Sequence, residues 1–358
     1  MLIERHLSTR RLLALFFPIL WPSVLHAQTQ AGRNGFDTAF VRDYSRLLTT
    51  RFYISTKYNL LELNGPGAVK DLVYRPNSKI NFGLGASYRA LTLNIGVGIP
   101  GLNQDEDKRG ETRYLDAQAN IHTKHWATNF FLQRFQGYYL SSHTLPELGW
   151  VQATAYPTRP DLVQFNLGAS TVYIHNNDRF SYRAAFNQDA WQRRSQGSLL
   201  VGGYFTYFRM NADSSIVPDR LTPLYSDGLQ LRRGGFVDLG PTVGYAYTLV
   251  LREHFFLTGS VVMGGGISLQ RATTESSDGA QLLKSGGGLG WHGQFRAGAG
   301  YNSARYFVGL SFNQENIGYL LDERSSFSWS VGNIRLNLAK RFDLRLKPLR
   351  GTLGLMGL

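Results

Sequence analysis

The stretch at residues 79–99 reads KINFGLGASYRALTLNIGVGI and contains two alternating runs joined by a short turn. Apolar side chains fall on every second position of residues 80–88 and again of residues 91–99. A period of two is that of a β-strand, whose successive side chains point to opposite faces. Each run has about the 9–11 residues that a tilted transmembrane strand needs. We therefore interpret the stretch as a transmembrane hairpin and expect Leu84 and Ile95, near its middle, to face hydrocarbon.

The start of the chain resembles an export signal. Residues 1–27 combine an arginine-containing beginning with a short apolar run, which is the pattern of a cleaved secretory signal peptide. An N-terminal anchor helix is the alternative, but Pro18 and Pro22 interrupt the apolar run. We predict a signal peptide (1–27), an N-terminal periplasmic segment (28–47), a barrel (48–342) and a C-terminal tail (343–358).

Composition favours a barrel in the outer membrane. The chain has no cysteine, which excludes disulfides, thiol chemistry and lipid attachment at an N-terminal cysteine. It is rich in Tyr, Phe and Gly yet mildly hydrophilic on average, as expected where a membrane face is hidden in alternation. A secreted all-β sandwich is the soluble alternative. The net charge of +13 comes from dispersed Lys and Arg without a nucleic-acid motif, so we expect no nucleic-acid partner.

Strand-like runs repeat to the end of the chain, and counting all of them gives about thirteen. Outer-membrane barrels have an even strand number, short periplasmic turns and longer outer loops. Placing residues 180–186 in a periplasmic or lumenal segment restores both features. The fold class we predict is all-β, a transmembrane antiparallel β-barrel of about 12 strands, with 10 or 14 as alternatives. We expect a short amphipathic turn or helix at 36–48 and long loops at 62–78, 101–110, 141–160, 210–234, 271–287 and 319–326, of which 210–234 is polar.

Several short motifs point to one family. They are residues 47–57 (LLTTRFYISTK), Tyr74-Arg75-Pro76-Asn77, Gly83-Leu-Gly85 with Tyr88, Leu93-Asn94, residues 195–198 (SQGS) and the hairpin strands after Phe236. Together they resemble a domain-of-unknown-function family of Gram-negative (Bacteroidetes-type) outer-membrane β-barrel proteins, domain of unknown function 4421. The resemblance covers roughly residues 36–342. It implies an outer-membrane β-barrel without an assigned activity, and no catalytic residue can be carried over from it.

The sequence offers no arrangement that predicts catalysis. Ser141, Ser142 and His143 lie in one loop, but neighbouring positions seldom give a usable Ser–His geometry, and no Gly-x-Ser-x-Gly elbow is near. The acidic cluster at 105–107 does not have the spacing of an EF-hand and is better explained as a solvated charged loop. We predict that the protein is not an enzyme and has no catalytic residue, cofactor or metal.

Charged and histidine side chains on the polar parity form the candidate site. We expect these residues to line the lumen: Lys79, Arg89, Asp116, His122, Asp238, His292, Arg296, Glu315 and Arg335. Both signs of charge are present. One interpretation is a hydrogen-bonded interior that closes or stiffens the barrel, and another is a selectivity lining for a small polar solute or anion. A role of the two histidines as metal ligands or general bases is a further alternative.

The sequence therefore predicts a cell outer-membrane β-barrel, exported through a signal peptide, that acts as a pore, a transport-accessory protein or a structural protein. One alternative is an outer-membrane hydrolase acting on lipid or peptide, which needs a Ser–His or Asp–His pair at the outer rim. Another is an assembly or secretion partner that docks a protein through the tail or the 210–234 loop. The expected partners are outer-membrane lipid and lipopolysaccharide, the barrel-assembly machinery and small polar solutes.

Overall fold

The computed structural model describes residues 35–64, 71–78, 80–89, 91–98, 105–141, 155–225, 227–275, 280–322 and 325–343. The chain divides into two units, Met1–Gly35 and Phe36–Leu358, and every element below belongs to the second. The predicted signal peptide and the predicted tail beyond residue 343 lie outside the described residues.

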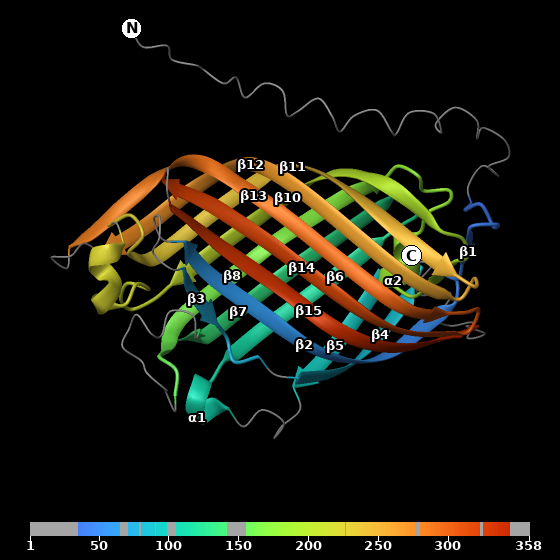
Figure 1. Cartoon of the computed structure of the whole chain (residues 1–358), viewed down its shortest axis with the longest axis horizontal. Coiled ribbons are helices and arrows are strands. Elements are labelled where there is room, and N and C mark those ends of the chain that lie inside the picture. Colours follow the sequence, from blue (N-terminus) through green and yellow to red (C-terminus); the bar gives the residue numbers. More distant parts are fainter. Residues whose placement is uncertain are drawn as a thin grey trace, which may run out of the picture. The chain divides into compact units, whose positions relative to one another are not determined.

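Twelve antiparallel strands form a closed ring, in which each strand pairs with the next and the last pairs with the first (Figure 1). The closing pair runs from Ser326↔Asn64 to Phe342↔Leu48. The prediction of an all-β antiparallel barrel of about twelve strands is therefore confirmed. The ring strands are β2 (Leu48–Asn64), β4 (Ile80–Tyr88), β5 (Leu91–Gly98), β6 (Arg113–His122), β7 (Trp126–Leu140), β8 (Thr158–Ile174), β10 (Gln196–Asn211), β11 (Leu231–Leu251), β12 (Phe255–Glu275), β13 (Gln281–Asn302), β14 (Tyr306–Asp322) and β15 (Ser325–Phe342).

The outer face of the ring is apolar, and the inner face of its first hairpin is polar. Leu84 and Ile95 are 54% and 75% exposed on the outside, whereas Asn81 and Ser87, on the opposite parity, are 3% and 1% exposed. Large exposed apolar side chains continue around the other strands, far beyond the patches that soluble monomers tolerate. This arrangement is that of a membrane-spanning barrel. No helix in the described part of the chain is both long and apolar enough to cross a bilayer.

The two ends of the ring differ. At the short-turn end lie the turns at residues 123–125, 252–254 and 303–305, together with the start of β2 and the end of β15. The opposite, long-loop end carries the connections after β2, β5, β7 and β10. The expected loop at 271–287 is wrong, since β12 and β13 stay paired as far as Glu275↔Gln281.

The connection at 212–230 corrects the expectation of a polar loop at 210–234. It contains the short 3₁₀ helix η1 (Asp219–Leu224), and it buries Ile216, Val217, Leu221 and Leu229. The burial of this loop could not be predicted from its sequence, because its apolar residues follow neither the helical nor the strand period. The loop packs into an apolar core at the long-loop end.

This apolar core is built from inward-facing side chains. Phe208, Phe236, Tyr319, Phe327 and Trp329 are almost fully buried in it. The rings of Phe236 and Tyr319 stack with centroids 4.3 Å apart. Packed rings leave little room for water, so the core closes the lumen towards the long loops.

Four further short elements lie outside the main ring order. The 180–186 segment stays out of the ring, as predicted, and contains α2 (Tyr182–Phe186). Residues 36–48 contain the expected turn, at 38–40, where the Val41 N–H donates to the carbonyl of Asp37 at 2.9 Å, and they contain no helix. The strand β1 (Val41–Asp43) follows and pairs with β9 (Ala190–Gln192) in a separate sheet. The charged loop at 101–110 contains α1 (Glu106–Arg109).

The wall of the ring is weakest between β5 and β6. In the described part of the chain these strands share two residue pairs, Leu91↔Ile121 and Thr92↔Asn120. By contrast, β4 and β5 share eight pairs, and β6 and β7 share ten. Towards the long loops, β3 (Leu72–Arg75) instead bridges β2 to β7. We call residues 93–98 of β5 and 115–119 of β6, between which the described part of the chain shows no strand pairing, the seam.

Candidate functional site

Residues 175–195, which connect β8 to β10, form a plug in the short-turn end of the lumen. Inward-facing side chains from several parts of the ring hold it. The Tyr182 hydroxyl lies 3.2 Å from Ser260 Oγ of β12, and the Tyr182 ring meets the His122 ring of β6 edge-on at 5.6 Å. Asn302 of β13 donates a hydrogen bond to the carbonyl of Ala190 at 3.0 Å. Contacts to three separate strands fix the plug across the mouth.

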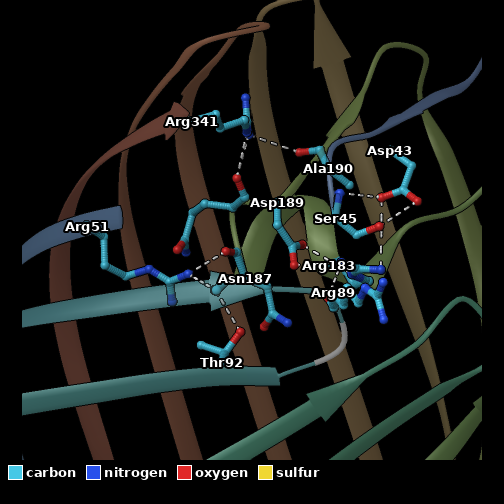
Figure 2. Close-up of polar contacts among 12 residues, drawn as sticks. Asp43, Ser45, Arg51, Arg89, Thr92, Arg183, Asn187, Asp189, Ala190 and Arg341 are labelled. Carbon is cyan, nitrogen blue, oxygen red and sulfur yellow. Dashed lines mark hydrogen bonds and ion pairs between the residues drawn. The ribbon is translucent and has the colours of Figure 1, made fainter. Parts of the chain in front are cut away.

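A buried ion pair fixes the fold of the plug itself (Figure 2). Arg183 donates to both carboxylate oxygens of Asp189, with Nε–Oδ1 at 3.2 Å and Nη2–Oδ2 at 2.7 Å. Arg183 Nη2 also donates to the carbonyl of Arg89 at 2.7 Å, which joins the plug to the turn after β4. Burial lowers the pKa of Arg183, but the Asp189 carboxylate and then Asp43 raise it by more, so the guanidinium stays charged.

Two further arginines reach the plug from adjacent ring strands (Figure 2). Arg51 of β2 donates to the carbonyl of Asn187 at 2.7 Å and to Ser87 Oγ. Arg341 of β15 donates to the carbonyl of Gln188 at 3.0 Å and to that of Ala190 at 3.3 Å. Both guanidinium groups bind backbone carbonyls, through hydrogen bonds that water could replace. Phe180, Tyr182 and Ala185 of the plug also pack in small apolar clusters with inward-facing residues of the ring.

A polar cavity of about 140 Å³ lies between the plug and the apolar core. Phe186 and Gln188 of the plug line it at one end, and Phe131 and Val331 of the core line it at the other. One buried water needs on the order of 10–15 Å³ on this measure, so the cavity has room for roughly ten waters or a small solute.

Most of the sequence-predicted lumen residues do lie inside the ring. Asp116, His122, Arg296, Glu315 and Arg335 line the cavity. Asp238 and His292 are buried around Tyr204, whose hydroxyl donates to Asp238 at 3.0 Å and whose ring stacks on His292 at 4.5 Å. Their role as a solute lining stays a prediction.

Two residues of the predicted lumen lining, Arg89 and Lys79, are not found in the lumen of the described structure. Arg89 is not on the lumen face, because it occupies the turn after β4 with φ 54° and an exposed side chain beside Tyr88. Only its backbone carbonyl reaches the plug. Lys79 lies outside the described residues.

The sequence reasoning missed Arg51, Lys57, Arg183 and Arg341. Arg51, Lys57 and Arg341 stand on the inward parity of their strands, so alternation could have identified them. Arg183 lies in a segment with no alternation, and only the tertiary structure brings it to Asp189.

The described residues hold no candidate metal cluster. Among them there is no group of three or more His, Asp or Glu side chains that could hold a metal ion. His122 Nε2 lies 3.2 Å from Asn129 Oδ1, and Asp105 of the acidic cluster pairs with Arg109 at 3.0 Å. Ser142 and His143 lie outside the described residues.

A closed ring with an apolar outer face, a plug and an internal polar cavity defines a plugged membrane-type β-barrel. Residues 36–342 match the family described as Domain of unknown function (DUF4421), and the chain belongs to this family. No curated protein matches the chain.

Solved barrel structures show low similarity to the chain. The outer-membrane protease OmpT from Escherichia coli is 9% identical, with 84% of this chain and 98% of that chain covered and a TM-score of 0.38. The toluene transporter TodX of P. putida is 9% identical, with 83% and 90% covered and a TM-score of 0.25. OmpT of Vibrio cholerae is 10% identical, with 81% and 97% covered and a TM-score of 0.27. At these scores nothing about the site is transferred from them.

Proposed function

We propose that the protein is an outer-membrane β-barrel that is closed to free solute flow at rest and acts as a transport-accessory protein rather than as a general pore. The observation that carries this proposal is the double closure of the lumen, by the plug at one end and by the apolar core at the other. Since short turns of outer-membrane barrels face the periplasm, the plug is assigned to the periplasmic side and the 212–230 loop to the cell surface.

The two closures differ in kind, which supports a gated barrel over a purely structural one. The plug is held by one buried ion pair, by hydrogen bonds to backbone carbonyls, which exchange with water at a small net change in free energy, and by two small apolar clusters around Phe180, Tyr182 and Ala185. The apolar core is held by stacked and tilted rings. The cavity between them far exceeds the voids of a packed interior, as expected for a barrel that receives a solute.

Fractionation tests the location. We expect the protein in the outer-membrane fraction, with migration on gels that changes on heating, because a folded barrel resists detergent until it is heated. Recovery as a soluble periplasmic protein would refute the membrane assignment.

Planar-bilayer recording tests the closure. We expect no steady conductance from the wild type, nor from Asp189→Asn, because the apolar core still blocks the lumen after the plug loosens. A variant that combines Asp189→Asn with Trp329→Ala and Phe327→Ala should show intermittent current. Steady ohmic conductance from the wild type would refute the closed barrel.

We also propose that the protein is not an enzyme. The hydrolase alternative needs a nucleophile beside a base at the outer rim, whereas the buried His122 neighbours Asn129 and the plug. Hydrolysis of lipid or peptide that His122→Ala or His143→Ala abolishes would overturn this proposal.

A further inference from the structure

The seam lies within the apolar outer surface of the barrel. On β5, Leu93, Ile95 and Val97 are exposed on the outer face, and Leu115 is exposed on β6. Strand edges that face hydrocarbon leave backbone N–H and C=O groups without water or a partner, which is strongly unfavourable. A seam at this place therefore needs a polar occupant, or it must open and close.

The polar cavity extends to the seam from inside. Asn94 and Gly96 of β5 and Gln118 and Asn120 of β6 line it. Gly96 and Gln118 stand on the inward parity of their strands and are nevertheless exposed. A group that enters between the two strands would therefore meet the cavity directly.

Two arginines in the cavity lack a carboxylate partner. Arg296 is 9% exposed and Arg335 is partly buried, and the buried Nε atom of each has no hydrogen-bond partner among the described residues. Aromatic rings hold their planes: Tyr182 lies 5.7 Å from the guanidinium of Arg296, and Tyr53 lies 4.2 Å from that of Arg335.

The acids that line the same cavity are already engaged. Asp116 pairs with Lys57 at 2.6 Å, and Glu315 lies 2.7 Å from His292 Nε2. Buried charge without a counter-charge is unfavourable, so the two free guanidinium groups favour an anion in the cavity. A planar guanidinium matches the paired oxygens of a phosphate or carboxylate.

We propose that the cavity binds a phosphate-type oxyanion between Arg296 and Arg335, and that the anion arrives through the seam as the head group of an amphiphile. This inference rests on the proposed membrane location but not on the closed lumen. Apolar chains would stay against Leu93 and Ile95, outside the barrel, while the head group enters past Gln118.

Equilibrium binding to the full chain in detergent tests the anion site. The probes are a short-chain phosphatidic acid, inorganic phosphate and a short-chain diacylglycerol at constant ionic strength. We expect saturable binding of the phosphatidic acid, weaker binding of phosphate and no binding of the neutral lipid. Arg296→Gln and Arg335→Gln should each weaken binding roughly 10-fold or more, since each removes a charge-assisted hydrogen bond.

Matched variants separate binding from folding. Arg305→Gln removes an exposed arginine in the turn at 303–305, away from the seam, and should bind as the wild type does. Arg335→Lys keeps the charge and should retain part of the affinity. Heat-dependent gel migration confirms that each variant is folded. Absence of saturable binding by the wild type, or equal binding by the glutamine variants, would overturn the anion site.

A cysteine pair tests the route, because the chain has no native cysteine. The register of the two existing pairs places Leu93 opposite Ala119, so Leu93→Cys with Ala119→Cys can be bridged by a short, reducible bifunctional thiol reagent. Bridging should abolish phosphatidic acid binding until reductant is added. The control pair, Ala117→Cys with Leu132→Cys, lies across fully paired β6 and β7 and should have no effect.

The outcomes distinguish the sources of the anion. If phosphate binds as tightly as phosphatidic acid and bridging changes neither, the ligand is a free anion and the seam route is refuted. A wild type that conducts steadily but still binds phosphatidic acid through Arg335 would refute the closed barrel and leave this site standing.

Discussion

Neutralising Asp189 should lower the stability of the closed plug, because Asp189 is the carboxylate partner of the buried Arg183. In Asp189→Asn, the buried Arg183 loses both of its short contacts to a carboxylate. Breaking a buried pair by removing one partner typically costs about 3–5 kcal/mol. The half-exposed Asp43 still lies 4.0 Å from Arg183, and the carbonyl of Arg89 still accepts a hydrogen bond. We therefore expect Asp189→Asn to destabilise the closed plug by an amount near the lower limit of this range, about 3 kcal/mol.

Thiol labelling within the plug measures this quantity directly. Ala185→Cys places the single thiol of the chain on α2, where Ala185 is buried against Phe256 and Phe307. When opening is fast relative to labelling, the labelling rate follows the open population of the plug. A loss of about 3 kcal/mol should raise the rate roughly 100-fold, since each 1.4 kcal/mol is a factor of ten.

Two comparisons decide whether the ion pair is responsible. Asp105→Asn breaks an exposed pair with Arg109 and should leave labelling unchanged, because such pairs contribute little. Arg183→Met together with Asp189→Leu removes both charges and should label more slowly than Asp189→Asn alone. A rate within threefold of the parent in Asp189→Asn would refute the view that this pair holds the plug.

Three other expectations concern the barrel. Leu84→Arg should destabilise the folded barrel by about 2–4 kcal/mol, because it places a charge on the lipid face. Gln118→Arg faces the cavity and should be tolerated. Heat-dependent gel migration after refolding measures the folded fraction of each variant. Trp329→Ala should destabilise the barrel by about 3–5 kcal/mol in a denaturant titration, because Trp329 is fully buried in the apolar core. The hydrogen bond from Arg193 lowers the pKa of Glu253 below its ordinary value of 4.5. The pair therefore stabilises the folded protein above pH 4.5, and this stabilisation is lost as the pH falls through the lowered pKa of Glu253. Glu253→Gln should flatten the dependence of stability on acid pH and change stability little at pH 7.

The ring could be predicted from the sequence because its signal is local. Outward positions such as Leu84 and Ile95 are apolar and their neighbours are small or polar, so a period of two appears within ten residues. The even strand number of barrels then placed residues 180–186 outside the wall. These two arguments together favour twelve strands and leave ten and fourteen as alternatives.

The plug contacts and the apolar core could not be predicted in the same way. In residues 205–210 (FTYFRM) both faces carry apolar side chains, so alternation does not tell the lumen from the lipid face. Arg183 lies in the short helix α2 and Asp189 lies six residues further along, beyond the end of that helix, so only the folded plug pairs them. The seam is a deficit of hydrogen bonds between strands, and sequence patterns carry no information on such a deficit.

The inner face of the barrel is polar towards the plug and apolar towards the long loops, and this difference decides where the barrel can open. The strands β15 and β2 switch together: their register pairs Asn333 with Lys57 in the polar half and Trp329 with Leu61 in the apolar half. Exposing even one core aromatic to water costs roughly 4 kcal/mol, at 25 cal/mol per Å² over about 150 Å². Freeing a backbone carbonyl from Arg341 costs far less, because water replaces the hydrogen bond. The plug buries three aromatic rings, those of Phe180, Tyr182 and Trp191, which are fewer than the core buries. Opening should therefore begin at the plug, and the apolar core should part only when something larger than water fills the space it leaves.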